Sequence, residues 1–174
     1  GRTSARTKLQ EDGASEATIA TFLHHYDALA GGATGMIPEE TIEPLTDLPQ
    51  LDNLHIAEEQ AREALAATVM IRLNGGLGTS MGLAGPKSVL PVRDGASFLD
   101  LIVRQVLATR ERYGVRLPLL LMNSFSTQED TLAALAKYPE LPVDGLPLDF
   151  VQSREPKLRE DDLTPVTWEA DPEL

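Results

Sequence analysis

The feature that most constrains this chain is a run of glycines directly after a short apolar stretch. Residues 68–73 are mostly apolar, and five of the chain's 13 glycines follow them, at Gly75, Gly76, Gly78, Gly82 and Gly85. Without a Cβ, such a loop lets its backbone N–H groups approach a phosphate or a base closely. Lys87 closes the run and adds a mobile positive charge. The pattern predicts a strand that ends in a nucleotide triphosphate site.

Composition narrows the classes of partner. A length of 174 residues suits one domain with a real core. The net charge of −12 argues against nucleic acid or an anionic membrane as partner, because both require a basic surface. No stretch reaches the ~20 apolar residues of a membrane helix, and the absence of cysteine fits a reducing compartment. We therefore expect a cytoplasmic protein without nucleic-acid or membrane partners; oligomeric state is not predicted.

The first third of the chain reads as helices joined by irregular segments. Residues 1–14 lack periodicity and predict a frayed start, whereas apolar residues at helical spacing predict a helix over 15–30. The segment 31–53 contains three prolines and predicts an irregular arm. A further helix is expected over 56–67. We accordingly divide the chain into a helical and irregular arm, 1–55, and the first part of a catalytic domain, 56–174.

From residue 68 onward, strands alternate with helices. Strands are predicted at 68–73 (buried), 88–92, 117–122 and 148–151, with a turn at 93–95. Ser97 and Asp100 form a capping box for a helix to about Tyr113, and Ser126 with Glu129 predicts the start of another to about Lys137. This order predicts an α/β fold with a doubly wound, mostly parallel sheet. Ligands of such sheets lie beyond the carboxyl ends of the strands, where the glycine loop, Asn123-Ser124 and Gln152-Ser153 are expected to converge.

Two common nucleotide motifs do not match the loop. A phosphate-binding P-loop requires glycine directly before its lysine, and here Pro86 intervenes between Gly85 and Lys87. A dinucleotide fingerprint would need glycine at Met81, and no acidic residue ends a second strand at the required distance. Both motifs are rejected.

The loop instead resembles the signature of the UTP–glucose-1-phosphate uridylyltransferases (UDP-glucose pyrophosphorylases). The similarity starts with Leu73-Asn-Gly-Gly-Leu-Gly-Thr-Ser-Met-Gly and Gly85-Pro-Lys-Ser. It continues, in order, with Phe98-Leu-Asp-Leu, Leu121-Met-Asn-Ser-Phe, Glu129-Asp-Thr, Phe150-Val-Gln-Ser and Pro156-Lys157. It covers about 56–157. The resemblance implies a Rossmann-like nucleotidyltransferase fold, incomplete at the C-terminus, because the family's later motifs have no counterpart.

The resemblance also implies an activity and a set of site residues. The family joins UTP and glucose 1-phosphate into UDP-glucose and pyrophosphate, with Mg²⁺ as cofactor. By similarity, backbone at Leu73, Asn74, Gly75 and Gly76 would hold the uridine, Gln152 would read the uracil, and Gly78, Thr79 and Lys87 would lie at the phosphates. A glutamine amide matches uracil O4 and N3–H with one donor and one acceptor. Metal ligands are not assigned: Asp94, Asp100 and Asp130 are present, but nothing in the sequence selects among them.

In this reaction a sugar-phosphate oxygen, already an anion, attacks the α-phosphorus in line, so no general base is needed. Lys87 is then the catalytic residue, and Lys87→Ala is expected to lower kcat by roughly 10²–10³. We expect the chain to be an N-terminal fragment that binds UTP weakly and does not turn over. The acidic stretch after Gln152 is expected to be solvated, without a closing element.

Two alternatives stay open. One is a non-catalytic nucleotide-binding or regulatory module that kept the loop. The other is a uridylyltransferase for another sugar phosphate such as N-acetylglucosamine 1-phosphate, whose enzymes favour arginine where this chain has Ser80. Asn74 could also serve only as a cap at the strand end.

Overall fold

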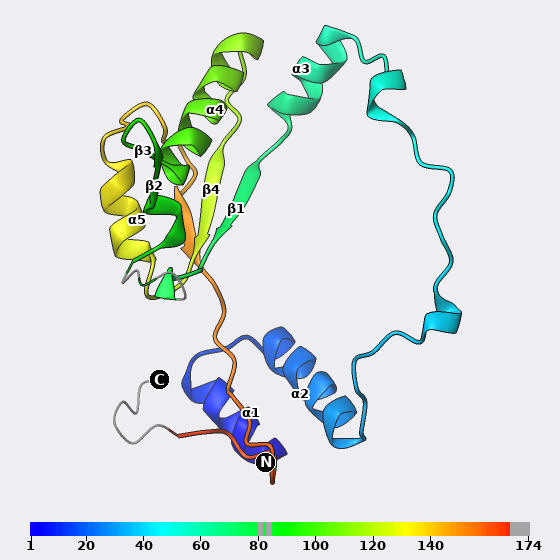
Figure 1. The fold of residues 1–174 in the computed structure, drawn as a ribbon. Coiled ribbons are helices and arrows are strands. Elements are labelled where there is room, and N and C mark those ends of the chain that lie inside the picture. The colour runs from blue at the N-terminus through cyan, green and yellow to red at the C-terminus, as the bar shows by residue number, and fades with distance from the viewer. Residues whose placement is uncertain (80–81, 83–84, 168–174) are drawn as a thin grey trace. The chain divides into compact units, whose positions relative to one another are not determined.

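A computed structural model describes residues 1–79, 82 and 85–167 (Figure 1). The chain forms two compact units, one of residues 1–48 with 153–174 and the other of residues 49–152. No helix in the described part of the chain is both long and apolar enough to cross a membrane. Ser80 and Met81, which enter the sequence argument, lie outside the described residues.

The first unit is built on a helical hairpin. Helix α1 (Arg2–Glu11) packs on α2 (Glu16–Ala30), and Leu9, Ile19 and Leu23 form its small core. The prediction of a frayed start over 1–14 was wrong, because Ala5 and Leu9 bury one stripe of α1 against α2. The predicted second helix is confirmed, and the Ser15 hydroxyl caps it by accepting from the Thr18 N–H at 3.1 Å.

The acidic stretch after residue 152 returns to these helices. Its backbone closes a turn in which the Val166 N–H donates to the Lys157 carbonyl at 2.8 Å. The Tyr26 hydroxyl donates to the Leu163 carbonyl, and the Lys8 ammonium donates to the Val166 carbonyl. Most described residues of the stretch are exposed, as expected, but two of its carbonyl groups are bound by side chains of α1 and α2; residues 168–174 lie outside the described residues.

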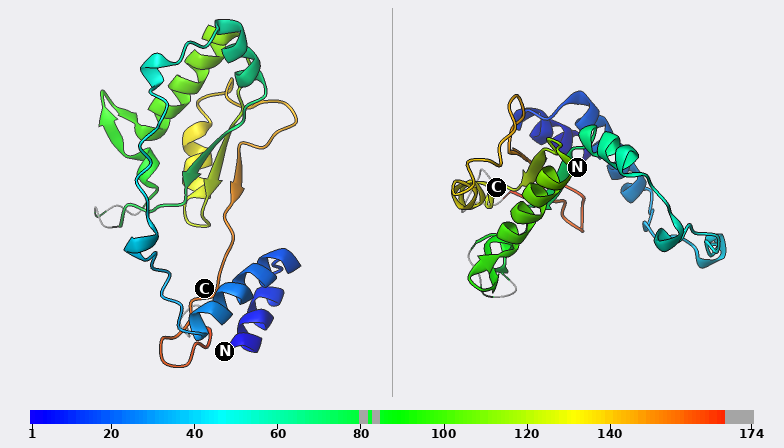
Figure 2. Two further views of the ribbon diagram at one scale, coloured as in Figure 1. Left: turned by 90° about the vertical axis from the view of Figure 1, so that its right-hand side faces the viewer. Right: turned by 90° about the horizontal axis from the view of Figure 1, so that it is seen from above.

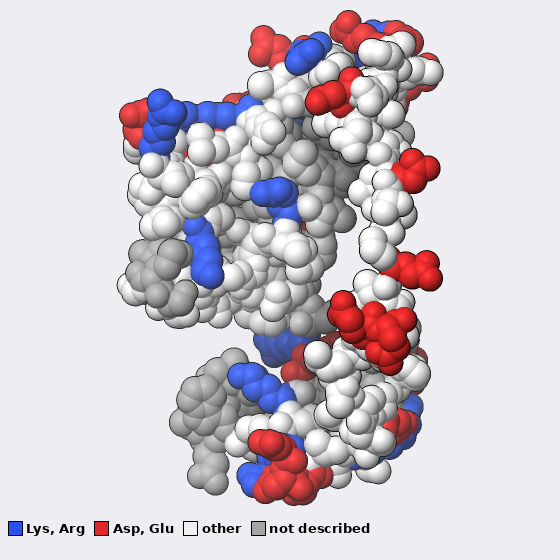
Figure 3. Space-filling model, turned by 45° about the vertical axis from the view of Figure 1, so that its right-hand side comes forward, with Lys and Arg blue, Asp and Glu red and all other residues white. Residues whose placement is uncertain are grey.

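An extended arm, residues 33–57, follows α2. It contains only the short 3₁₀ turns η1 (Glu39–Thr41) and η2 (Leu51–Asn53), which agrees with the irregular segment predicted there. Figure 3 shows acidic side chains spaced along it, and its sequence contains no lysine or arginine. Helix α3 (Glu58–Ala66) comes next and leads into the sheet.

The second unit contains a three-stranded parallel sheet in the order β1 (Met70–Asn74), β4 (Leu119–Asn123), β5 (Asp149–Val151). Between β1 and β4 lie the 3₁₀ turn η4 (Lys87–Val89), a hairpin of β2 (Pro91–Arg93) and β3 (Ala96–Ser97), and helix α4 (Phe98–Tyr113). Helix α5 (Gln128–Leu135) connects β4 to β5. The parallel α/β fold is confirmed.

Both crossover helices cover the same face of the sheet (Figure 2). Because the strands are added in one direction, right-handed crossovers place α4 and α5 on one side. There Val103 and Val106 of α4 and Leu135 of α5 pack on Leu119 and Leu121 of β4. The opposite face carries half-buried Leu120 and Met122.

Local departures from the predicted elements have simple causes. Strand β1 is not buried as predicted, since among the described strands it pairs only with β4, at the sheet edge, and leaves Ile71 54% and Leu73 77% exposed. The strand predicted at 88–92 begins only at Pro91, because Lys87–Val89 form a 3₁₀ turn. The turn at 93–95 and the Ser97–Asp100 capping box are confirmed.

Candidate functional site

The three parallel strands end in one row. Asn74 pairs with Asn123, and Asn123 with Val151, so the next residues along the three strands, Gly75, Ser124 and Gln152, begin the loops of one edge. A Cβ placed on Gly75 would lie 2.5 Å from Gln152 Oε1 and 3.6 Å from Ser124 Cβ. The expected convergence at the carboxyl ends of the strands is confirmed for these residues, and only glycine fits beside the Gln152 amide without moving it.

The described ends of the glycine loop, residues 76–79 and 85–87, pair as the two sides of a hairpin at this edge. The Gly78 N–H donates to the Gly85 carbonyl at 3.0 Å, the Lys87 N–H donates to the Gly76 carbonyl at 3.1 Å, and Leu77 bridges to Pro86. Pro86 is fully buried in this hairpin. The chain then enters a 3₁₀ turn at Lys87, where a P-loop would begin an α-helix, so the structure agrees with the rejection of that motif.

The remaining predicted residues lie on or near the same loop. The Lys87 side chain runs beside Gly76, with its Cδ 3.8 Å from a Cβ built there, and the residue is exposed. Gly78 is buried, Thr79 is exposed, and Leu73 is the exposed penultimate residue of β1. The structure thus places an exposed cation and main-chain groups within one hairpin beside Gln152.

Asn74 is held by a buried polar network. Its amide Nδ2 donates to Asn123 Oδ1 at 2.7 Å and to Thr131 Oγ1 at 2.8 Å, and its carbonyl accepts from the Thr127 hydroxyl at 2.8 Å. Asn74 is 8% exposed, and Asn123, Thr127 and Thr131 are fully buried. The side chain of Asn74 therefore secures the strand end, as the alternative of a cap at that end anticipated.

Sequence reasoning missed the part of this network contributed by α5. Thr127, not Ser126, is the N-cap residue of α5, and its hydroxyl accepts from the Ser124 N–H at 2.9 Å instead of capping the helix. Thr131, one helical turn later, reaches Asn74. The i, i+4 spacing of the two threonines on one face was the available signal.

The aspartates considered as metal ligands do not form a site. Asp94 lies in the exposed β2–β3 turn beside Arg93. Asp100 accepts from the Ser97 N–H, the Tyr138 hydroxyl and Lys137. Asp130 Oδ2 lies 3.4 Å from a Cβ built on Gly85. Among the described residues no group of three acidic, histidine or cysteine side chains could hold a metal ion.

Asp100 is instead a structural carboxylate. Burial alone would raise its pKa, but the hydrogen bonds from Lys137, the Ser97 backbone and Tyr138 outweigh burial and hold its pKa well below the ordinary range. Burial raises the pKa of the Tyr138 hydroxyl, and its hydrogen bond to the Asp100 carboxylate raises that pKa further. These contacts tie the start of α4 to the segment after α5.

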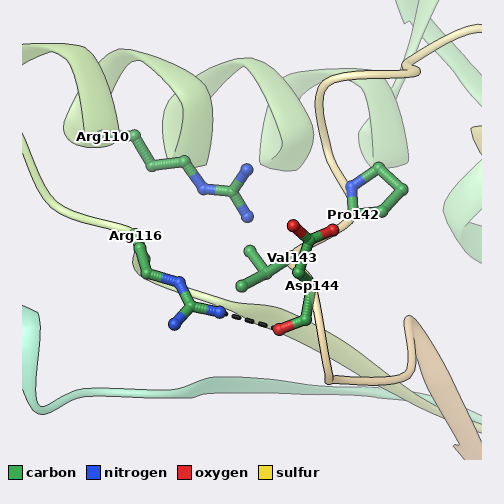
Figure 4. Close-up of a pocket in the computed structure, with 5 residues that line it drawn as sticks. All are labelled: Arg110, Arg116, Pro142, Val143 and Asp144. Carbon is green, nitrogen blue, oxygen red and sulfur yellow. Dashed lines mark hydrogen bonds between the residues drawn. The ribbon is translucent and has the colours of Figure 1, made fainter.

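A hollow of about 530 Å³ lies where the chain approaches β4 and β5 from their amino ends (Figure 4). Arg110 in its wall donates to the carbonyls of Leu117, Glu140 and Leu141, and Arg116 donates to the carbonyl of Asp144. Burial lowers the pKa of Arg110. The two arginines brace the backbone, and the hollow belongs to the opposite end of the strands from Gly75 and Gln152.

Comparison with known proteins gives one consistent result. The family model described as UTP–glucose-1-phosphate uridylyltransferase matches residues 19–174. Relatives of that name from Solanum tuberosum and, as a probable one, from Schizosaccharomyces pombe are 41% and 42% identical over 75% and 77% of this chain. The chain spans 25% of the length of each.

Solved structures agree with the sequence comparison. The UDP-glucose pyrophosphorylase of Leishmania major superposes with a TM-score of 0.88 at 36% identity, covering 99% of this chain and 36% of that one. A UDP-glucose phosphorylase of Trypanosoma brucei gives 0.82 at 41% identity, covering 98% and 36%. The chain belongs to the UTP–glucose-1-phosphate uridylyltransferase family.

Proposed function

We propose that this chain provides the UTP-binding part of a uridylyltransferase that makes UDP-glucose and pyrophosphate from UTP and glucose 1-phosphate. The observation that carries the proposal is the meeting of Gly75, Gln152 and the Lys87 hairpin at one edge of the sheet. The relatives' names support the reaction, as does the structure of a Leishmania major variant in complex with UDP-glucose, a protein 36% identical to this chain.

We infer that different residues of the site bind different parts of the nucleotide. The Gln152 amide reads the uracil edge, and Gly75 leaves the space in which that amide lies. Backbone at Leu73, Asn74 and Gly76 holds the uridine. The hairpin residues Gly78 and Thr79, with Lys87, lie at the triphosphate.

Catalysis in this proposal depends on positioning and charge. The attacking oxygen of glucose 1-phosphate is already anionic, so the chain needs no general base. Lys87 is exposed and close to Gly76, and its ammonium compensates negative charge on the phosphates during transfer. The described residues do not supply a ligand set for Mg²⁺. We propose that the triphosphate oxygens and water would supply most of the ligands of the ion, as is common for Mg²⁺.

Nucleotide selectivity tests the proposal directly. In calorimetric titrations of the chain with UTP, CTP and ATP, we expect UTP to bind most tightly. Gln152→Ala should lower the preference, whereas Gln105→Ala, the same truncation on the exposed surface of α4, should keep it unchanged. Equal affinities for the three nucleotides in the unchanged chain would contradict the proposal. A UTP preference without UDP-glucose formation, even when this chain is joined to the remaining residues of a full-length relative, would favour the non-catalytic module.

The sugar is proposed to be glucose on the names of the relatives alone. The residue that argued against N-acetylglucosamine 1-phosphate, Ser80, lies outside the described residues. Competing the two sugar phosphates against each other in a uridylyl-transfer assay of this chain joined to the remaining residues of a full-length relative would decide between them. A larger kcat/KM for N-acetylglucosamine 1-phosphate would overturn the assignment.

A further inference from the structure

A glutamine amide alone does not distinguish uracil from cytosine. Rotated by half a turn, it exchanges its donor and acceptor and matches cytosine as well as uracil. Selection of uracil therefore requires a polar atom whose character is fixed by the protein. The network below the site contains such an atom.

The fixed point of the network is the carboxylate of Asp149 on β5. Asp149 Oδ2 accepts from Asn123 Nδ2 at 2.9 Å and from Gln128 Nε2 at 2.8 Å. A carboxylate has no hydrogen to donate, so a flipped Asn123 amide would set oxygen against oxygen. The Asn123 amide therefore has one stable orientation, with Oδ1 toward Asn74.

Asn74 is oriented from two sides. Asn123 Oδ1 can only accept, and Asn74 Nδ2 meets it at 2.7 Å. The Thr131 hydroxyl donates to the Thr127 carbonyl, so its oxygen accepts the second Nδ2 hydrogen of Asn74 at 2.8 Å. Both donors of Asn74 are used inside the protein. Its Oδ1, to which no described residue donates, is left as a pure acceptor on a residue 8% exposed next to Gly75.

The same network reaches Gln152. The carbonyl of Asn123 accepts the Gln152 N–H at 2.8 Å, so a single fully buried residue is bonded to Asn74 through its side chain and to Gln152 through its backbone. Movement of Asn123 would displace both.

We propose that Asp149, Asn123 and Asn74 form an orienting relay that makes Asn74 Oδ1 a fixed acceptor for a hydrogen-bond donor of the bound nucleoside. Asp149 and Asn123 are positioning residues in this relay. The donor is either the base N3–H, which cytosine lacks, in which case the Gln152 amide contacts uracil only by donating to O4, or a ribose hydroxyl, in which case Gln152 bonds both O4 and N3–H. The inference rests on the proposed function, because it assigns the ligand atoms of the same site.

The test is the isosteric variant Asp149→Asn, since an amide at 149 can donate as well as accept and leaves the Asn123 orientation unfixed. We expect its Kd for UTP to rise about tenfold, the effect of one well-made hydrogen bond, with the Kd for tripolyphosphate unchanged. Asp144→Asn is the matched control, because the Asp144 carboxylate lies outside the relay and that residue bonds Arg116 through its backbone. A purely structural role for Asp149 would weaken UTP and tripolyphosphate equally.

CTP and the 2′-deoxy and 3′-deoxy forms of UTP identify the donor. If Asn74 Oδ1 accepts from N3–H, the variant loses affinity for UTP but not for CTP. If it accepts from the ribose, CTP and UTP lose alike, and 2′-deoxy- or 3′-deoxy-UTP loses less. Unchanged UTP affinity in Asp149→Asn would overturn the relay.

NMR of the chain without nucleotide separates the relay from the proposed function. The side-chain NH₂ groups of Asn74 and Asn123 should exchange slowly with solvent in the unchanged chain and rapidly in Asp149→Asn. Fast exchange in the unchanged chain would overturn the relay by itself. If exchange is slow but UTP does not bind the unchanged chain, the proposed function fails, and with it the ligand assigned to Asn74 Oδ1.

Discussion

An alanine at position 75 would place a methyl group against the tip of the Gln152 side chain. The Cβ would lie 2.5 Å from Gln152 Oε1, whereas ordinary contact begins near 3.4 Å. The next nearest atom outside Gln152 is Ser124 Cβ at 3.6 Å, which needs no adjustment. Because the close atom ends a flexible side chain, we expect the Gln152 amide to retreat by about 0.9 Å and the fold to persist.

A shift of that size breaks a hydrogen bond to a base. Loss of one such bond, with its partner left desolvated, costs about 1–3 kcal/mol, so the Kd of Gly75→Ala for UTP should rise roughly 5- to 150-fold. Calorimetry measures the affinity for UTP. Urea titrations followed by circular dichroism measure the free energy of unfolding, which should change by less than about 1 kcal/mol.

A double-mutant cycle with Gln152→Ala tests the cause. If alanine at 75 acts by displacing the Gln152 amide, Gly75→Ala should have little further effect once that amide is gone. Additive losses in the cycle, or an unchanged Kd for the single variant Gly75→Ala, would refute this reasoning.

Three further predictions concern stability and charge. Ser97→Ala removes the hydroxyl that accepts from the Asp100 N–H and should lower the free energy of unfolding by about 1 kcal/mol in urea titrations; no change would mean that the cap is dispensable. Asp100 has a lowered pKa in the folded chain, so its stabilising effect is present above the unfolded value of about 3.9 and is lost as pH falls through the folded value. Asp100→Asn should therefore be less stable near pH 7 and lose less stability between pH 5 and 2, and a parallel pH profile would contradict the assignment. Arg110→Lys cannot reproduce three bonds to backbone carbonyls and should cost about 2 kcal/mol in the same titrations while UTP affinity is retained, since the hollow lies at the other end of the strands.

Much of the fold was predictable because its signals are local. The apolar run before Asn123, the Ser97–Asp100 box and the glycine loop each define an element within a few residues, and the structure has all three. The helix at 2–11 was missed because its stabilising contacts come from α2, beyond the reach of its own weak periodicity. The exposure of β1 could not be predicted from its own residues either, because an apolar strand has the same local sequence pattern at the centre and at the edge of a sheet.

The candidate site likewise combines residues that local motifs predict with residues that only distant contacts bring together. Gly75, Lys87 and Gln152 could be selected from motifs, and their convergence followed from the rule for parallel sheets. The relay could not, because Asp149, Asn123 and Asn74 are separated in sequence and meet only through the register of three strands. The residues around Asn74 in the sequence do not show whether its side chain binds the nucleotide or donates both of its amide hydrogens to other residues of the protein.

The most direct test of the account is chemical-shift mapping of the chain with UTP. We predict that the backbone amides of Gly75, Gly76 and Gly78 and the side-chain amide of Gln152 shift on addition of UTP. Tripolyphosphate should move only the hairpin signals around Gly78 and Lys87. Shifts that gather instead around Arg110 and Arg116, or UTP signals indistinguishable from those of tripolyphosphate, would contradict a uridine-reading site at this edge of the sheet.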